Sequence, residues 1–327
     1  MMHHGPPAFV FLFRASHWLG WICLFALLAG VAVAQTPPRP SELSPARPVA
    51  EEEPITPIPQ PPAADPLKLA LGERLFSDPR LSADGKLSCS SCHDLRTNGA
   101  RGSAAHKGSD PFDAPTVFNA SLNYRLNWEG NFRSLAAQAE SALENPANLH
   151  TNLNEVVRKL DADADVVRDF RAAYARLPER DNVLDALVTF ERSLLTPGSR
   201  FDRWLGGDAS ALSAGEFEGY RLFRSFGCSS CHQGVNVGGN LFERQGVFRP
   251  LVAGPPERVR VPSLRNVATT APYFHDGSAA TLQDAVRRMA AAQLDRTLTD
   301  QQLTSLVAFL QTLTGNYRGS PVVGAPP

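Results

Sequence analysis

The sequence carries the five-residue pattern CSSCH twice, at 89–93 and at 228–232. Two thiols at this spacing can form thioether bonds to one edge of a haem, and the histidine that follows can bind its iron. A zinc site would need knuckles close in sequence, whereas these are 139 residues apart, and a redox-active CxxC needs neither a second copy nor a histidine. We therefore predict two covalent c-type haems, one on Cys89, Cys92 and His93 and the other on Cys228, Cys231 and His232.

The two patterns anchor an internal repeat. Asn119 lies in PTVFNA after the first pattern, and Asn266 lies in PSLRNVA after the second. Counting from each asparagine, a glycine recurs at position +11 and a leucine at +16, while Trp128 and His275 share position +9. These offsets predict two related modules, divided near Pro197-Gly198.

The modules differ at the position that could supply a sixth iron ligand. Met289 lies 57 residues after His232 in the predicted helix TLQDAVRRMAAAQL, whereas its equivalent in the first module is Ala142. A haem with a thioether ligand carries electrons, and a haem with an open position can activate a small molecule. Met289 could instead be a core residue, and His106 could be a removable cap on the first haem or a surface histidine.

Helical patterns dominate from Leu67 onward. Apolar residues recur at three- and four-residue spacing in 67–76, 163–177, 182–195 and 213–226, and capping boxes open helices after Ser213 and Thr299. We find no convincing strand pattern, and the long loops 95–115 and 233–262 are rich in Gly and Pro. The expected fold is all-α, with two cytochrome c-like haem domains and long connecting loops.

The N-terminal region has the composition of an export signal and a spacer. Residues 1–34 contain an apolar run that ends in Ala-Val-Ala, which predicts a cleaved signal peptide; an uncleaved membrane anchor is the alternative. Residues 35–66 form a Pro-rich linker that we expect to be extended and mobile, either as an inert tail or as a tether. The net charge of −1 argues against nucleic acid as a partner.

Over about residues 68–316 the sequence resembles the bacterial dihaem cytochrome c peroxidases. The resemblance rests on LGERLFSDPRLS, SCSSCH, APTVFNA, FGCSSCHQG, VPSLRNVATTAPYFHDG and the methionine fourteen residues after His275. It implies a periplasmic enzyme that reduces hydrogen peroxide with electrons from a small cytochrome c or a cupredoxin. Residues 67–198 would form the peroxidatic haem domain and 199–327 the electron-transfer haem domain. A homodimer is compatible with this family.

The resemblance also implies roles for individual residues. Trp128 would relay electrons between the haems, Gln138 would hydrogen-bond a bound peroxide, and His275 would lie near the haem propionates. A calcium ion would bind between the domains, with ligands from the side chain of Asp113 and the backbone carbonyls of Thr270 and Pro272.

One position departs from the family pattern. Asn148 stands where the peroxidases have a glutamate that moves a proton over the open haem, and an amide cannot do this at a useful pKa. Glu144, one helical turn earlier, is the candidate substitute. The alternatives to a peroxidase are a dihaem oxidase that modifies a partner protein, whose known example has Tyr in place of Met289, and a non-enzymatic electron carrier or peroxide sensor.

Overall fold

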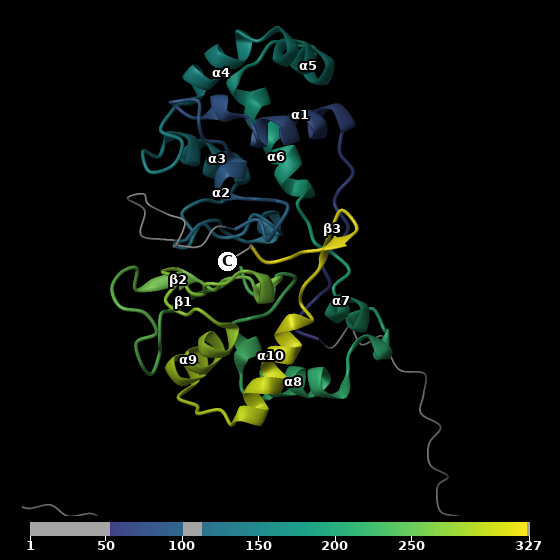
Figure 1. The fold of residues 1–327 in the computed structure, drawn as a ribbon, viewed down its shortest axis with the longest axis vertical. Helices are drawn as coiled ribbons and strands as arrows, with labels where there is room; N and C mark the ends of the chain where they lie inside the picture. Colours follow the sequence, from purple (N-terminus) through teal and green to yellow (C-terminus); the bar gives the residue numbers. More distant parts are fainter. Residues whose placement is uncertain (1–52, 101–112, 326–327) are drawn as a thin grey trace, which may run out of the picture. The chain divides into compact units, whose positions relative to one another are not determined.

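The fold consists of short helices joined by long loops (Figure 1). A computed structural model describes residues 53–100 and 113–325, so the predicted signal peptide, most of the Pro-rich segment and His106 lie outside the described residues. The α-helices are α1 (Pro66–Phe76), α2 (Cys89–Cys92), α3 (Leu135–Glu144), α4 (Leu153–Asp161), α5 (Ala164–Tyr174), α6 (Arg180–Ser193), α7 (Arg200–Leu205), α8 (Ala214–Ser225), α9 (Leu282–Leu294) and α10 (Asp300–Gln311). The predominantly helical prediction is confirmed.

Short 3₁₀ turns and two small hairpins complete the described structure. The 3₁₀ turns are η2 (Pro79–Leu81), η4 (Ala120–Leu122), η5 (Ala209–Ala211), η6 (Cys228–Ser230) and η7 (Val267–Thr269). The antiparallel hairpins pair β1 (Phe242–Arg244) with β2 (Arg258–Arg260) and β3 (Asn316–Tyr317) with β4 (Ser320–Pro321). Strands of two or three residues are too short to show an alternating pattern, which is why the sequence did not predict them. Within the described part, no helix has the length and apolar character needed to cross a membrane.

Each half contains a pair of helices that cross at a glycine. A Cβ atom built on Gly72 of α1 would lie 2.0 Å from the Ala186 carbonyl oxygen of α6, and one on Gly219 of α8 would lie 1.9 Å from that of Ser305 in α10. One turn after each glycine a phenylalanine meets another from the partner helix, Phe76 with Phe190 and Phe223 with Phe309. The helices can approach so closely only because glycine has no side chain.

The internal repeat is confirmed by backbone geometry. Asn119 and Asn266 both adopt the left-handed conformation, with φ of 61° and 60°. Isolated β-bridges follow at equal offsets, between Leu126 and Phe132 in the first module and between Tyr273 and Ala279 in the second. Helices α3 and α9 then begin sixteen residues after their asparagines, as the leucine spacing indicated.

The two asparagines meet at one buried threonine. The Nδ2 atoms of Asn119 and Asn266 donate to Thr196 Oγ1 over 2.8 and 3.0 Å, and the Thr196 N–H donates back to Asn119 Oδ1 over 2.9 Å. A hydroxyl oxygen has two lone pairs and can accept both bonds. The junction between the modules, next to Pro197, is therefore fixed by hydrogen bonds on both sides.

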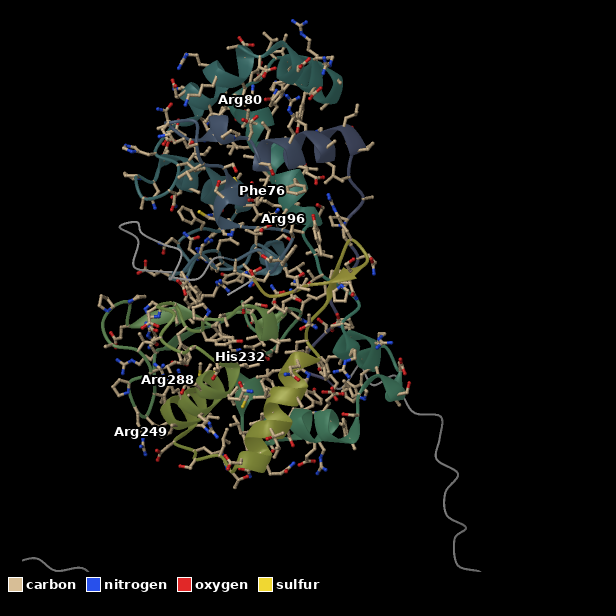
Figure 2. The ribbon with its side chains drawn as sticks, in the orientation of Figure 1. Phe76, Arg80, Arg96, His232, Arg249 and Arg288 are labelled. Carbon is tan, nitrogen blue, oxygen red and sulfur yellow. The ribbon has the colours of Figure 1, made fainter. Side chains whose placement is uncertain are left out.

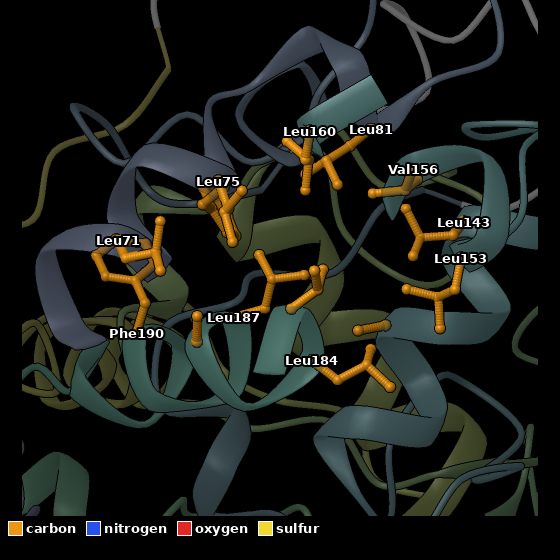
Figure 3. Close-up of a cluster of buried hydrophobic side chains, with 14 of the residues drawn as sticks. Leu71, Leu75, Leu81, Leu143, Leu153, Val156, Leu160, Leu184, Leu187 and Phe190 are labelled. Carbon is orange, nitrogen blue, oxygen red and sulfur yellow. The ribbon is translucent and has the colours of Figure 1, made fainter. Parts of the chain in front are cut away.

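The ends of the described chain are exchanged between two hydrophobic cores. The first core is built on α1, α3, α4 and α6 (Figure 3) and also includes Val322, with Tyr317 packed against it. The second is built on α7–α10 and includes Ile55 from the Pro-rich segment. The proposed division into 67–198 and 199–327 therefore separates the modules along the sequence, but each core also contains a residue from outside its own range.

Residues 53–58 form an ordered strap, which corrects the prediction of a mobile spacer for this part of the linker. Ile55 and Ile58 are buried, and Arg265 donates to the Thr56 carbonyl oxygen over 2.8 Å. The same guanidinium forms a buried ion pair with Asp202, 2.7 Å away. Proline content misled the prediction because the two isoleucines between the prolines provide apolar area to bury.

Candidate functional site

The first cavity contains the first CSSCH pattern. Cys89 and Cys92 are the first and last residues of α2, and both line the cavity together with His93. The Nδ1 atom of His93 lies 3.0 Å from the Gly99 carbonyl oxygen. A histidine whose Nδ1–H donates to a carbonyl presents Nε2 as the metal-binding atom, so this residue is arranged as an axial ligand would be.

The second cavity is lined by Cys228 and His232 of the second pattern and by Met289. Cys228 is the first residue of η6, and Cys231 follows that turn. The Nδ1 atom of His232, which is labelled in Figure 2, lies 3.2 Å from the Val237 carbonyl oxygen. Burial lowers the pKa of His232 to about 4, so the ring is neutral and able to bind a metal. Met289 of α9 lines the same cavity as Cys228 and His232.

The cysteines do not fit the two alternative chemistries. The four that the structure describes form no disulfide, and Cys89 and Cys92 line one cavity while Cys228 lines the other. Burial raises the pKa of Cys89 to about 12 and that of Cys228 to about 11, whereas a redox-active CxxC has a lowered thiol pKa. Among the described residues, no cluster of three or more His, Cys, Asp or Glu side chains is suited to hold a metal ion. Two apolar cavities, each lined by cysteine and an oriented histidine from one CSSCH pattern, fit two haems.

The side chains opposite the first CSSCH pattern come mainly from α3 and the turn after it. Gln138, Ala142 and Asn148 all line the first cavity. Glu144 does not line it and is exposed at the end of α3. Because successive helical residues are rotated by about 100°, Glu144 points to the side of α3 opposite Ala142. The structure therefore does not support the prediction that Glu144 replaces the missing acid.

Glu191 of α6 is a partly buried acid, with a buried Oε2 atom, that the sequence reasoning missed. It lines the first cavity, its Oε2 atom has no hydrogen-bond partner, and burial raises its pKa to about 8. Ala186 and Ser305 are equivalent because each lies against the crossing glycine of its module, and five residues after them stand Glu191 and Leu310. Leu310 of α10 therefore takes the place of Glu191 in the second cavity. A signal was present in the sequence, because Glu191 lies four residues after the buried Leu187, on the apolar face of its helix.

Several residues line both cavities and so form a partition between them. Trp128 belongs to this group, and its Nε1–H donates to the Asp113 carbonyl oxygen over 2.9 Å. The ring of His275 meets that of Trp128 edge to face, with 6.2 Å between centroids. His275 is buried and its carbonyl oxygen accepts from the Asp113 N–H over 3.0 Å. The predicted relay, the predicted propionate neighbour and the predicted calcium ligand Asp113 are thus brought together.

The other two predicted calcium ligands lie in the same region. Thr270 and Pro272 line the second cavity, as does Asp113. The side chain of Asn98 donates to the Thr269 carbonyl oxygen, which links this loop to the first module.

Comparison with known proteins identifies the family. Residues 66–210 match the model of di-haem cytochrome c peroxidase, and residues 217–314 match that of cytochrome c. The chain is 38% identical to "Cytochrome c551 peroxidase" of Nitrosomonas europaea, over 85% of this chain and 89% of that protein. It belongs to the di-haem cytochrome c peroxidase family. Membership makes it an oxidoreductase with two c-type haems that uses cytochrome c as electron donor and peroxide as substrate.

Two further relatives agree with this assignment. "Cytochrome c peroxidase Ccp" of Escherichia coli is 38% identical over 83% of this chain, which spans 63% of that longer protein. A crystal structure described as a MauG-like protein associated with microbial copper homeostasis has a TM-score of 0.66 and 29% identity, covering 79% of this chain and 93% of the other.

Proposed function

We propose that the first haem of this peroxidase is the peroxidatic centre and the second is the point of electron entry. The observation that carries this assignment is the difference between the cavities: Met289 lines the second, whereas Ala142 occupies the equivalent place in the first. His93 and His232 would be the proximal ligands, on Cys89 and Cys92 and on Cys228 and Cys231, respectively. A haem held by His93 would supply a place for peroxide and electrons for its reduction.

The residues of this chain would perform the remaining tasks. Gln138 lines the first cavity and would orient a bound peroxide through its amide. Trp128 lies at the partition and would relay electrons between the haems. Asn148 faces the first cavity but cannot carry a proton, so we propose that turnover is slow compared with that of an enzyme with an acid there.

The Asn148→Glu variant tests this account of the proton. General acid–base catalysis contributes about 10²–10⁴-fold, so we expect the variant to reduce peroxide at least tenfold faster than the natural chain. Glu144→Gln is the matched control, because Glu144 is exposed, and its rate should equal that of the unmodified protein. Loss of turnover in Glu144→Gln would show that the acid has moved to that helix after all.

The location, additional ion and assembly remain proposals. We propose a periplasmic enzyme exported by residues 1–34 and divided near Pro197-Gly198, somewhat before the gap between the two family matches at 66–210 and 217–314. A calcium ion would bind Asp113 with the carbonyls of Thr270 and Pro272. A cupredoxin would be an alternative donor, and a homodimer is compatible with the family.

Spectroscopy of the half-reduced protein separates a peroxidase from an electron carrier. A peroxidase should show a high-spin first haem when only the second is reduced, and added peroxide should oxidise both irons. Two low-spin haems in every redox state, with no peroxide turnover, would identify a carrier or sensor. An oxidase acting on a partner protein is disfavoured because Met289 lines the second cavity.

A further inference from the structure

Arg260 holds a buried positive charge between the two cavities. It ends β2, and only 5% of its surface is exposed. The Arg260 N–H donates to the Trp128 carbonyl oxygen over 2.7 Å, and its Nε donates to that of Asn127 over 3.1 Å. The residue therefore belongs by sequence to the second module, while its guanidinium is held against the turn of the first.

The guanidinium has unused hydrogen-bonding capacity. Its Nη1 atom is buried and has no partner among the described residues. Burial lowers the pKa of Arg260 to about 10, and among the residues that the structure describes no carboxylate opposes this effect. Burying a cation without a counter-ion is strongly unfavourable, so this position is suited to an anion supplied by a bound group.

Arg260 lines both cavities. The groups that would occupy them bring carboxylates of their own, because each haem carries two propionates. The remaining donors of a guanidinium form a planar fork that matches a carboxylate in bidentate geometry. Asp113 also lines both cavities, but it is acidic and so repels propionates rather than neutralising them.

We propose that Arg260 is the shared counter-ion of the propionates of both haems, and that its charge helps to set both reduction potentials. Adding an electron to a haem adds negative charge, which a nearby buried cation stabilises. Because one guanidinium faces both cavities, its loss affects both haems. This inference rests on the proposed placement of the haems at the two CSSCH patterns.

The test is a potentiometric titration of the Arg260→Gln holoprotein. We expect each one-electron reduction to become at least tenfold less favourable, a fall of about 59 mV per haem. Arg260→Lys retains the charge and should restore most of the loss. Arg244→Gln is the matched control in the same hairpin, because Arg244 pairs with Glu257 at the surface. Its two reduction equilibrium constants should stay within threefold of the natural values, a change of less than about 30 mV per haem.

Two results would overturn the proposal: potentials in Arg260→Gln that differ from the natural ones by less than about 30 mV, which is a threefold change in the equilibrium constant, or a shift confined to one haem. If Arg260→Gln yields no folded holoprotein, Arg260→Lys carries the test through resonance Raman spectroscopy. Loss of the fork should shift the propionate bending bands, and unchanged bands would refute the contact. The number of covalently bound haems per natural chain is measured separately. A number below two would contradict the proposed haem sites, whereas the potentials of the Arg260 variants test the role of Arg260.

Discussion

Glu191 should make the stability of this protein fall as pH rises through neutrality. Burial raises its pKa from 4.5 to about 8, so the folded state holds a proton that the unfolded state has lost. Each pKa unit corresponds to about 1.36 kcal/mol, which places the full cost of ionising Glu191 in the fold at about 5 kcal/mol. The contribution of the neutral carboxyl is complete below pH 4.5 and is lost as pH rises toward 8.

The window from pH 6.5 to 8 isolates this effect. In the holoprotein His232 would bind iron rather than titrate, and burial lowers the pKa of His275, so the effect of His275 on stability is confined to pH values below about 6.5. Across the window Glu191 should remove about 2 kcal/mol from the free energy of unfolding. Urea unfolding of the oxidised holoprotein, followed by far-UV circular dichroism at both pH values, measures the difference.

Glu191→Gln removes the titration while keeping the shape of the side chain. Its unfolding free energy should be nearly the same at pH 6.5 and 8, whereas the exposed Glu144→Gln should retain the natural dependence. Glu191→Leu, which copies Leu310 of the second module, should behave as Glu191→Gln does. If the Gln variant loses as much stability across the window as the natural chain, Glu191 has an ordinary pKa and the reasoning is refuted.

Three further substitutions test a buried ion pair, a helix crossing and the proposed iron ligand Met289. Arg265→Met leaves Asp202 buried without its partner and should cost about 3–5 kcal/mol of unfolding free energy in urea titrations; a loss below 1 kcal/mol would contradict this. Gly219→Ala places a methyl group against the Ser305 carbonyl oxygen and should cost about 1–3 kcal/mol, while Gly215→Ala, at an open position of the same helix, should cost nothing. Met289→Ala should lower the reduction potential of the second haem and remove its low-spin spectrum, with the first haem unchanged; an unchanged second haem would show that Met289 is only a core residue.

The sequence predicted those parts of the site that depend on local spacing. The CSSCH patterns, the repeat and the position of Met289 could all be counted along the chain, and the structure places Met289 in the cavity of His232. Helix capping at Ser213 and Thr299 was equally local and is confirmed.

What the sequence did not predict depends on contacts between distant residues. Arg260 and Trp128 meet through a backbone hydrogen bond across 132 residues, and no pattern in either segment indicates the other. The strap was missed because its partners, Asp202 and Arg265, lie far downstream. Glu144 was chosen for its distance from Asn148 along the chain, but its direction from the helix excludes it from the cavity.

The exchanged chain ends make the two cores depend on each other. The strap lies 209 residues before Arg265, which binds the Thr56 carbonyl, so the second core closes over a long stretch of chain. The first core takes in Val322, which follows the second core in sequence. A fragment cut between the two modules would therefore leave both cores incomplete, and neither module is an independent folding unit.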